Sequence, residues 1–302
     1  MATAQFGRVI TAMITPFTED GAVDYESAVA LAKHLVAHGS EGLLVGGTTG
    51  EGATMTAEEK LKLYTLIVDA VGKRGEGKKV PVMGNIGTIS TADTIAFGNK
   101  AKETGIDCAL VIVPFYVKPN QEGMYQHFTA VAKGVDLPLV LYNVPGRTGV
   151  SIQSETIKRI VDECPNVVGI KDATGSWDQV TKEKALLPED FMIYSGDDAF
   201  TLPVLLAGGV GIISVSAHVI GDDMLAMVDA FEKGDLEKAR ELHLKMYEIN
   251  KGMFFTASPT PVKTATNLVG QPGGHFRLPM VEPTEAEKAK VRQMLENYGG
   301  LL

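Results

Sequence analysis

The chain has 302 residues, of which 45% are hydrophobic and 22% are charged. This composition is typical of a globular protein and excludes a disordered, collagen-like or disulfide-scaffold chain. A length of about 250 to 300 residues suits one α/β barrel, although two smaller domains are an alternative. The formal charge is −9 and no Lys/Arg run exceeds Lys78-Lys79, which disfavours nucleic acid and anionic membranes as partners.

The cysteines and the N-terminal segment indicate a cellular setting. Cys108 and Cys164 form no Cys-x-x-Cys pair, and MATAQFGRVI lacks the features of a secretory leader. We therefore expect a reducing cytoplasm. The stretch between Asp198 and Asp222 carries no full charge, but Pro203 and its glycines predict a helix, a turn and a buried strand rather than a membrane span.

Eight short apolar runs predict the strands of a parallel barrel. Amphipathic stretches separate them, which is the pattern of repeated βα units. A doubly wound open sheet is the alternative, but it usually has fewer strands and a Gly-rich first turn, and the first turn here is Thr15-Pro16-Phe17. We predict a (β/α)8 TIM barrel over residues 1–224. Its strands lie near 9–14, 42–45, 80–84, 108–113, 137–141, 167–170, 192–194 and 211–215.

Capping residues predict where some helices begin. Asp24, Thr56 with Glu59 three residues later, and Ser151 followed by Ser154 each precede an amphipathic stretch. After Asp222 the pattern is helical throughout. Residues 225–302 are therefore predicted to form a C-terminal helical region, interrupted at the Ser-Pro-Thr-Pro segment 258–261.

Chemistry in such a barrel lies at the C-terminal ends of the strands. The second strand is followed by Gly-Gly-Thr-Thr-Gly-Glu-Gly, in which Thr48 and Thr49 supply hydroxyls and the glycines allow the backbone to approach a ligand. The fifth strand ends at Tyr142, which is either a packing residue or a proton carrier. The Pro-Gly pair after it predicts a type II turn that directs Arg147 over the barrel mouth, where it can bind a carboxylate.

The sixth strand ends at Lys171. An amine at the rim of an apolar barrel is desolvated, which lowers its pKa and leaves a lone pair free to attack a carbonyl. A single lysine is more often solvated or snorkelling at a surface. The hypothesis of a Schiff base becomes stronger because a hydroxyl pair, a tyrosine and an arginine are predicted at the same end of the barrel.

Other candidate sites are weaker. His34 and His38 lie four residues apart on the first predicted helix, but no third ligand accompanies them, so we predict no metal site. The glycines of 208–211 resemble a phosphate loop. They precede the eighth strand, however, and lie at the end of the barrel away from the active face, so tight packing explains them better.

These strand-exit residues, together with segments 114–123 and 195–198, resemble the dihydrodipicolinate synthase family from Gly7 to Leu302. The resemblance implies a pyruvate-dependent Schiff-base lyase of diaminopimelate and lysine biosynthesis. It implies a (β/α)8 barrel that assembles as a homotetramer of two tight dimers and uses no cofactor. In the same way, Lys171 matches the Schiff-base lysine and Tyr142 the proton donor and acceptor.

The remaining roles also come from the resemblance. Thr48 and Tyr116 match the other members of a proton relay, with Tyr116 reaching into the neighbouring subunit's site. Thr49 and Ile213 match pyruvate-contacting positions, Ile213 through its backbone. Gly196 matches a main-chain position beside the lysine.

The implied reaction joins pyruvate to L-aspartate 4-semialdehyde, whose carboxylate Arg147 would hold. The related N-acetylneuraminate lyases and 2-keto-3-deoxy-gluconate aldolases share the lysine and tyrosine, but they resemble this sequence less at Arg147 and form the alternative. A keto-acid binding protein would not need Lys171. A metal-dependent aldolase would need a histidine and carboxylate cluster, which the strand exits lack.

Members of the family that lysine inhibits carry polar residues where this chain has Gly52, Ala57, Lys60, Ile89 and Phe115. A cationic Lys60 and an apolar Ile89 disfavour a second ammonium group. We therefore expect weak inhibition by lysine, or none.

Overall fold

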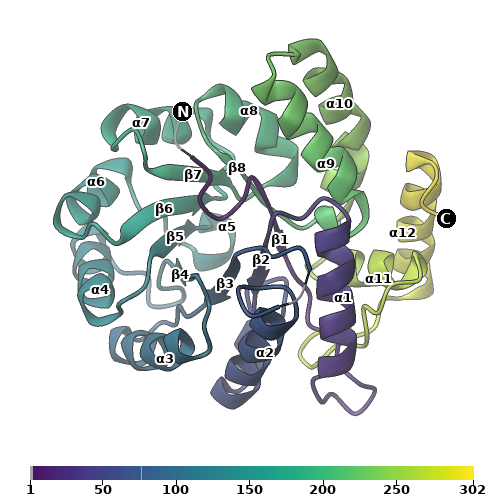
Figure 1. The fold of residues 1–302 in the computed structure, drawn as a ribbon, viewed down its shortest axis with the longest axis horizontal. Coiled ribbons are helices and arrows are strands. Elements are labelled where there is room, and N and C mark those ends of the chain that lie inside the picture. The colour runs from purple at the N-terminus through teal and green to yellow at the C-terminus, as the bar shows by residue number, and fades with distance from the viewer. Residues whose placement is uncertain (1–2, 76) are drawn as a thin grey trace.

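The computed structural model describes residues 3–75 and 77–302 and forms a closed barrel of parallel strands in the order β1 to β8. Figure 1 shows the strands at the centre with helices around them. The predicted fold is confirmed, and each predicted apolar run overlaps the strand that it was expected to form. The strands are β1 Val9–Ala12, β2 Gly42–Val45, β3 Val82–Asn85, β4 Cys108–Ile112, β5 Leu139–Asn143, β6 Val167–Asp172, β7 Met192–Ser195 and β8 Gly211–Ser214.

The helices follow the strands in chain order. Those up to β8 are α1 Tyr25–Ala37, η1 Gly52–Thr54, α2 Ala57–Ala70, α3 Thr91–Glu103, α4 Gln121–Gly134, α5 Pro145–Thr148, α6 Ser154–Glu163, α7 Trp177–Leu186, η2 Asp198–Phe200 and α8 Thr201–Leu206. After β8 come α9 Ala217–Glu232, α10 Leu236–Gly252, α11 Thr260–Leu268 and α12 Glu285–Tyr298.

Two apolar clusters hold the barrel together. The inner cluster fills the barrel itself with side chains such as Leu44, Val140 and Ile213. The outer cluster packs the opposite strand faces against the surrounding helices. Because successive strand residues point to opposite faces, nearly every strand residue is buried on one side or the other. This explains why the strands appear in the sequence as continuous apolar runs.

Two of the three predicted helix starts agree with the structure. Asp24 caps α1, and Thr56 with Glu59 forms a capping box at α2. The prediction for Ser151 is wrong, because α6 begins at Ser154 after Gln153, which makes no side-chain cap. Ser151 instead accepts a hydrogen bond of 3.1 Å from the side-chain amide of Asn143 at the end of β5.

The glycines before β8 serve packing, as expected. A Cβ at Gly209 would lie 2.4 Å from Val204 Cγ1, and one at Gly211 would lie 1.9 Å from the carbonyl oxygen of Arg8. A side chain at either position would push the eighth strand away from its neighbours. The phosphate-loop interpretation is therefore not needed for this segment.

The C-terminal region contains α11, a helix that the sequence analysis did not predict. Every residue from Thr260 to Thr266 is buried, including three threonines and Lys263, so the polar residues of this segment do not mark a solvent-exposed face. The predicted boundary between residues 224 and 225 falls within α9. The division into a barrel and a separate helical region therefore stays a prediction.

A buried ion pair joins this C-terminal region to the loop after β2. Lys263 Nζ on α11 lies 2.7 Å from Glu51 Oε1, and the two side chains are 0% and 2% exposed. The other carboxylate oxygen of Glu51 accepts from the backbone N–H of Arg277 at 3.2 Å. Arg277 in turn pairs with Glu59 of α2 at 2.7 Å. Removing one partner of a buried pair leaves an uncompensated charge, so both ends depend on this contact.

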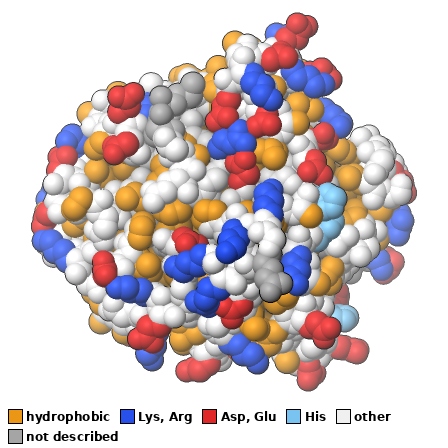
Figure 2. Space-filling model, in the orientation of Figure 1, with side chains coloured by type: hydrophobic (Ala, Val, Ile, Leu, Met, Phe, Trp, Pro, Cys, Tyr) orange, Lys and Arg blue, Asp and Glu red, His pale blue; other side chains and the backbone are white. Residues whose placement is uncertain are grey.

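The surface carries both signs of charge. Figure 2 shows acidic side chains among the basic ones across the face that it presents, consistent with the overall charge of −9. None of the helices in residues 3–75 and 77–302 has the length and apolar composition that crossing a bilayer requires.

The Lys263→Met substitution tests the buried pair. We expect it to lower the free energy of unfolding by about 3–5 kcal/mol, because Glu51 would remain buried and unpaired. Urea denaturation measures the change. The matched control is Lys158→Met, which removes an exposed lysine 2.6 Å from Asp162 and should cost about 0–1 kcal/mol. Equal losses in the two variants would contradict a stabilising role for the buried pair.

Candidate active site

Strand register brings the lysine and the tyrosine together. Tyr142 on β5 and Lys171 on β6 are register partners, so both side chains point into the barrel near its C-terminal end. Lys171 Nζ lies 4.6 Å from the centre of the Tyr142 ring. Tyr142 belongs to the inner cluster and is buried. A nucleophilic amine and a phenolic hydroxyl thus share one desolvated space.

The surroundings of Lys171 favour its neutral form. The residue is 5% exposed, and burial lowers the pKa of its amine to about 8. The negative charge of Asp198 opposes this shift, whereas the positive charge of Arg147 adds to it. Burial likewise raises the pKa of the Tyr142 hydroxyl, against the opposing effects of the Arg147 charge and of the nearby Thr48 hydroxyl. At neutral pH the tyrosine keeps its proton while part of the lysine is free to react.

The loop after β2 places two hydroxyls beside this pair. Thr48 is close enough to Tyr142 to lower the pKa of its hydroxyl, and Thr49 is buried. The glycines let the loop fold on itself, and their expected role in letting the backbone approach a ligand stays a prediction. A Cβ at Gly52 would lie 1.9 Å from the carbonyl oxygen of Gly46. The loop is therefore closely packed, and it holds its threonines in a fixed position.

Arg147 lies on the exposed rim of the barrel mouth. The predicted type II turn is wrong: residues Pro145–Thr148 form one helical turn, α5, and the left-handed residue is Gly149, with a φ of 74°. Proline suits the first position of a helix, and the Gly149 N–H donates to the Pro145 carbonyl, which closes the turn. The rim position of Arg147 that the turn was meant to explain is nevertheless present.

Tyr116 lies apart from the other proposed relay residues. Its side chain is 86% exposed, and its backbone has a φ of 66°, which is uncommon for a residue with a bulky side chain. Phe115 and Val117 beside it are also exposed. With so exposed a side chain, Tyr116 does not share the buried space of Lys171 and Tyr142 within one chain.

Gly196 and Ile213 complete the set of predicted site residues. The Gly196 N–H donates to the carbonyl of Asp172 at 2.6 Å, and a Cβ there would lie 2.7 Å from Ala173 Cβ. Ile213 on β8 is fully buried in the inner cluster. Both residues lie at the C-terminal ends of strands adjoining or near β6, at the same end as Lys171.

Sequence analysis missed Asp198 as a functional residue. Its carboxylate is buried and accepts from the N–H groups of Val215 at 3.0 Å and Ser216 at 3.3 Å, and from the Ser214 hydroxyl. These bonds hold the exit of β8 and keep a negative charge near Lys171. The sequence does contain a feature that indicates this residue, namely the acidic pair in Ser195-Gly196-Asp197-Asp198, which directly follows a strand.

Two cavities open at the barrel mouth. One of about 310 Å³ is lined by Thr48, Asn85, Tyr142 and neighbouring residues, and another of about 510 Å³ by Tyr116 and Arg147. Phe115 lines both. Together they present the hydroxyls of Thr48 and Tyr142 and the cation of Arg147, which suits a small anionic carbonyl compound.

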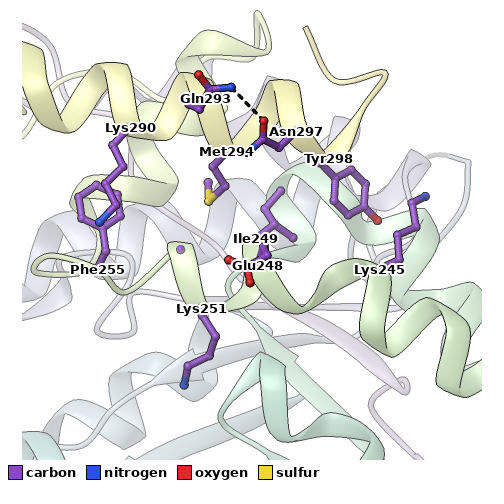
Figure 3. A pocket seen from close by; sticks show the side chains of 11 residues that line it. Lys245, Glu248, Ile249, Lys251, Phe255, Lys290, Gln293, Met294, Asn297 and Tyr298 are labelled. Carbon is purple, nitrogen blue, oxygen red and sulfur yellow. Dashed lines mark hydrogen bonds between the residues drawn. The ribbon is translucent and has the colours of Figure 1, made fainter.

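A groove of about 530 Å³ lies elsewhere, between α10 and α12 (Figure 3). Two of its three lysines lie over aromatic rings, Lys290 Nζ 4.3 Å from the centre of Phe255 and Lys245 Nζ 4.7 Å from that of Tyr298. Unlike Lys171, Lys245 is exposed and paired with Asp223 at 2.6 Å, so it is not a desolvated amine. The site at the barrel mouth is therefore the better candidate, although its cavities are the smaller ones.

The histidine pair fits its interpretation as a surface feature. The rings of His34 and His38 lie 4.4 Å apart, and His38 bonds with Asp222 at 3.1 Å. Within the described ranges, no three His, Cys, Asp or Glu side chains are grouped so that they could hold a metal ion.

The residues that bear on lysine inhibition lie near the smaller cavity. Lys60 Nζ is 4.5 Å from the centre of the Phe97 ring, and Ile89 is exposed. Both line the cavity that contains Thr48. The expectation of weak inhibition stays a prediction.

Comparison with known proteins gives one consistent result. The profile of the Dihydrodipicolinate synthetase family matches residues 5–298. The chain is 48% identical over 295 residues to the 4-hydroxy-tetrahydrodipicolinate synthase of Heliobacterium modesticaldum, covering 98% of this chain and 96% of that protein.

Solved structures agree. The dihydrodipicolinate synthase of Cyanidioschyzon merolae with lysine bound superposes with a TM-score of 0.94 at 41% identity, covering 98% of this chain and 99% of that one. The chloride-inhibited enzyme of Acinetobacter baumannii complexed with pyruvate superposes with a TM-score of 0.92 at 35% identity, with the same coverage of 98% and 99%.

The Gly52→Ala substitution tests the close packing of the loop after β2. Because the new methyl group would meet the Gly46 carbonyl, we expect the free energy of unfolding to fall by about 1–3 kcal/mol, measured by urea denaturation. Faster amide exchange should be confined to the loop. The control is Gly146→Ala, where a Cβ meets nothing within 4 Å and no loss is expected. A Gly52→Ala protein as stable as this control would show that the loop can accommodate a methyl group at this position.

Proposed function

The chain belongs to the dihydrodipicolinate synthetase family, and from this premise we propose that it condenses pyruvate with L-aspartate 4-semialdehyde through a Schiff base on Lys171. Its activity is that of a lyase of the 4-hydroxy-tetrahydrodipicolinate synthase type, since relatives at 43% to 48% identity carry that name. The sugar-acid lyases and aldolases are not favoured. One observation carries the assignment of Lys171: its amine is buried beside Tyr142 at the barrel mouth.

The first steps concern pyruvate alone. Neutral Lys171 attacks the ketone carbon and forms a carbinolamine, which loses water with a proton from Tyr142 and becomes an imine. The protonated imine nitrogen withdraws electrons from the neighbouring carbon. Loss of one proton from the methyl group then gives an enamine.

The second half joins the two substrates. The enamine carbon attacks the aldehyde carbon of aspartate semialdehyde, and the alkoxide that forms takes up a proton. The amino group of the same substrate then attacks the imine carbon. As the ring closes, the bond to Lys171 breaks and the free amine is restored.

Proton transfer in this scheme runs through hydroxyl groups. Thr48 and Tyr142 line the same cavity, and Thr48 lowers the pKa of the Tyr142 hydroxyl, which supports a relay between them. In our proposal, the third member is Tyr116 supplied by a second subunit. Its side chain is exposed and its backbone conformation is strained, and both support that role, because the tyrosine is hardly packed against its own chain. The assembly that we propose is a homotetramer built from two tight dimers.

Binding of the two anionic substrates is divided between backbone and side chain. We propose that the pyruvate carboxylate is held by Thr49 and nearby backbone amides, with the Ile213 and Gly196 backbones lining the opposite side. Arg147 binds the carboxylate of aspartate semialdehyde from the rim, where its two N–H donors can engage both oxygens. The chemistry needs no cofactor, and we propose the cytoplasm as the setting.

Borohydride trapping after addition of pyruvate tests the nucleophile. We expect one label, on Lys171, and a trapping rate that rises with pH until about pH 8, the pKa of the amine. With this pKa, about one amine in ten is neutral at pH 7, compared with about one in 3,000 for an ordinary lysine. Lys182→Arg is the control, since Lys182 is exposed and paired with Glu155. A label on any other residue would refute the mechanism.

The Arg147→Leu substitution tests the substrate assignment. We expect kcat/KM for aspartate semialdehyde to fall by about 10 to 100-fold, because a bidentate charge-assisted contact is lost. Pyruvate trapping at Lys171 should continue. Lys118→Gln removes another cation from the same cavity and should have little effect on kcat/KM. Unchanged kcat/KM in Arg147→Leu, or turnover of sialic acid or ketodeoxygluconate in the unmodified protein, would favour the sugar-acid alternative.

A further inference from the structure

The end of β6 carries different chemistry on its two faces. Lys171 points into the barrel, so the next residue, Asp172, points outward to the layer between sheet and helices. Asp172 is 2% exposed, and Glu183 on α7 is 0% exposed. The two carboxyl groups lie close enough that each shifts the pKa of the other. Two acidic groups thus meet where there is no solvent, directly behind the lysine.

One oxygen of each carboxyl group accepts hydrogen bonds from neighbouring donors. Asp172 Oδ1 accepts from the backbone N–H of Thr174 at 2.9 Å and from its hydroxyl at 2.5 Å. Glu183 Oε1 accepts from the side-chain amide of Gln179 at 2.8 Å. The remaining oxygens, Asp172 Oδ2 and Glu183 Oε2, have no N–H or O–H donor among the described residues. A buried carboxylate oxygen without a donor is costly, and one proton placed between the two would satisfy both.

No cation is available to neutralise the pair in the part of the chain that the structure describes. Lysines on α7 are engaged elsewhere: Lys182 binds Glu155, and Lys184 donates to the Glu189 carbonyl. Helix α8 carries no charged residue, and the only titratable side chain on β7 is Tyr194. The charged groups of α6 are paired on the surface, namely Glu155 with Lys182, Lys158 with Asp162, Arg159 with Glu122, and Glu163 with Lys133.

We propose that Asp172 and Glu183 share one proton, and that this hydrogen bond between acid and carboxylate is a positioning element that fixes the end of β6 and therefore Lys171. The backbone of Asp172 supports such a role, since its carbonyl accepts from Gly196 at 2.6 Å and couples β6 to the residue after β7. Only the catalytic consequence rests on the proposed function, in which Lys171 is the nucleophile.

A shared proton makes stability depend on pH in a defined direction. Burial raises the pKa of both carboxyls, and the charge of Asp172 raises that of Glu183 further, well above its ordinary value of 4.5. The folded chain therefore keeps a proton that the unfolded chain releases. The stabilisation is present below pH 4.5 and is lost as the pH rises through the pKa of the folded pair, where two like charges would face each other.

The Glu183→Gln substitution keeps a hydrogen bond to Asp172 but removes the titratable proton. The amide donates permanently to Asp172 Oδ2 and still accepts from Gln179, so the contact survives without a titratable group. We expect the free energy of unfolding of this variant, followed by urea denaturation from about pH 5 to about pH 9, to depend less on pH than that of the unmodified protein. Asp190→Asn, in the exposed turn after α7, is the control and should keep the original pH dependence.

Glu183→Ala removes the contact altogether. It leaves Asp172 Oδ2 without a partner, and we expect pyruvate trapping at Lys171 to slow by about tenfold while Glu183→Gln stays close to the unmodified rate. Equal pH dependence of unfolding in Glu183→Gln and the unmodified protein would overturn the shared proton. Trapping by Glu183→Ala at the unmodified rate would overturn the positioning role. If no protein traps pyruvate, the proposed function fails, while the unfolding series still tests the pair.

Discussion

The removal of the Lys171 amine from water is the constraint on which the site depends. A charged amine inside a barrel is costly, and the cost falls on the protonated form, so burial increases the share of neutral amine at neutral pH, which is the form that the proposed mechanism needs. The barrel makes this possible because its inner cluster closes below the lysine while the strand ends remain open above it. Asp198 limits the shift by keeping a negative charge nearby, so that the amine remains poised between its two forms.

The other buried charged groups are stabilised in different ways. Lys263 is also fully buried, but Glu51 pairs with it, and the result is a structural contact rather than a reactive group. Asp198 is stabilised by the N–H groups at the start of α9. Asp172 and Glu183 have each other. The same low-dielectric interior therefore gives four outcomes, and the identity of the neighbouring group decides which one occurs.

Much of the fold was predictable because barrel strands are buried on both faces and appear as apolar runs at regular spacing. The site residues were predictable because parallel strands of a barrel end on the same side, so Tyr142, Arg147 and Lys171 had to lie at one mouth. The misses have physical causes. Helix α11 buries threonines and a lysine, which a sequence pattern assigns to a polar surface, and α5 depends on a local bond between Gly149 and Pro145. The partners of Glu51 and Glu183 lie elsewhere in the fold, and a sequence pattern does not identify contacts of that kind.

The net charge of the chain differs in sign from the charge at the mouth of the barrel. A net charge of −9 should repel two anionic substrates, yet the mouth of the barrel presents Arg147 at its rim and Lys171 below. Coulombic effects at this range depend on the nearest few groups, because charges beyond about 10 Å are screened by salt. Several acidic residues of the outer helices are paired with lysines and arginines there. The acid balance of the chain therefore concerns its behaviour in bulk solution, while in the proposed mechanism the two cations at the strand ends attract the substrates into the barrel.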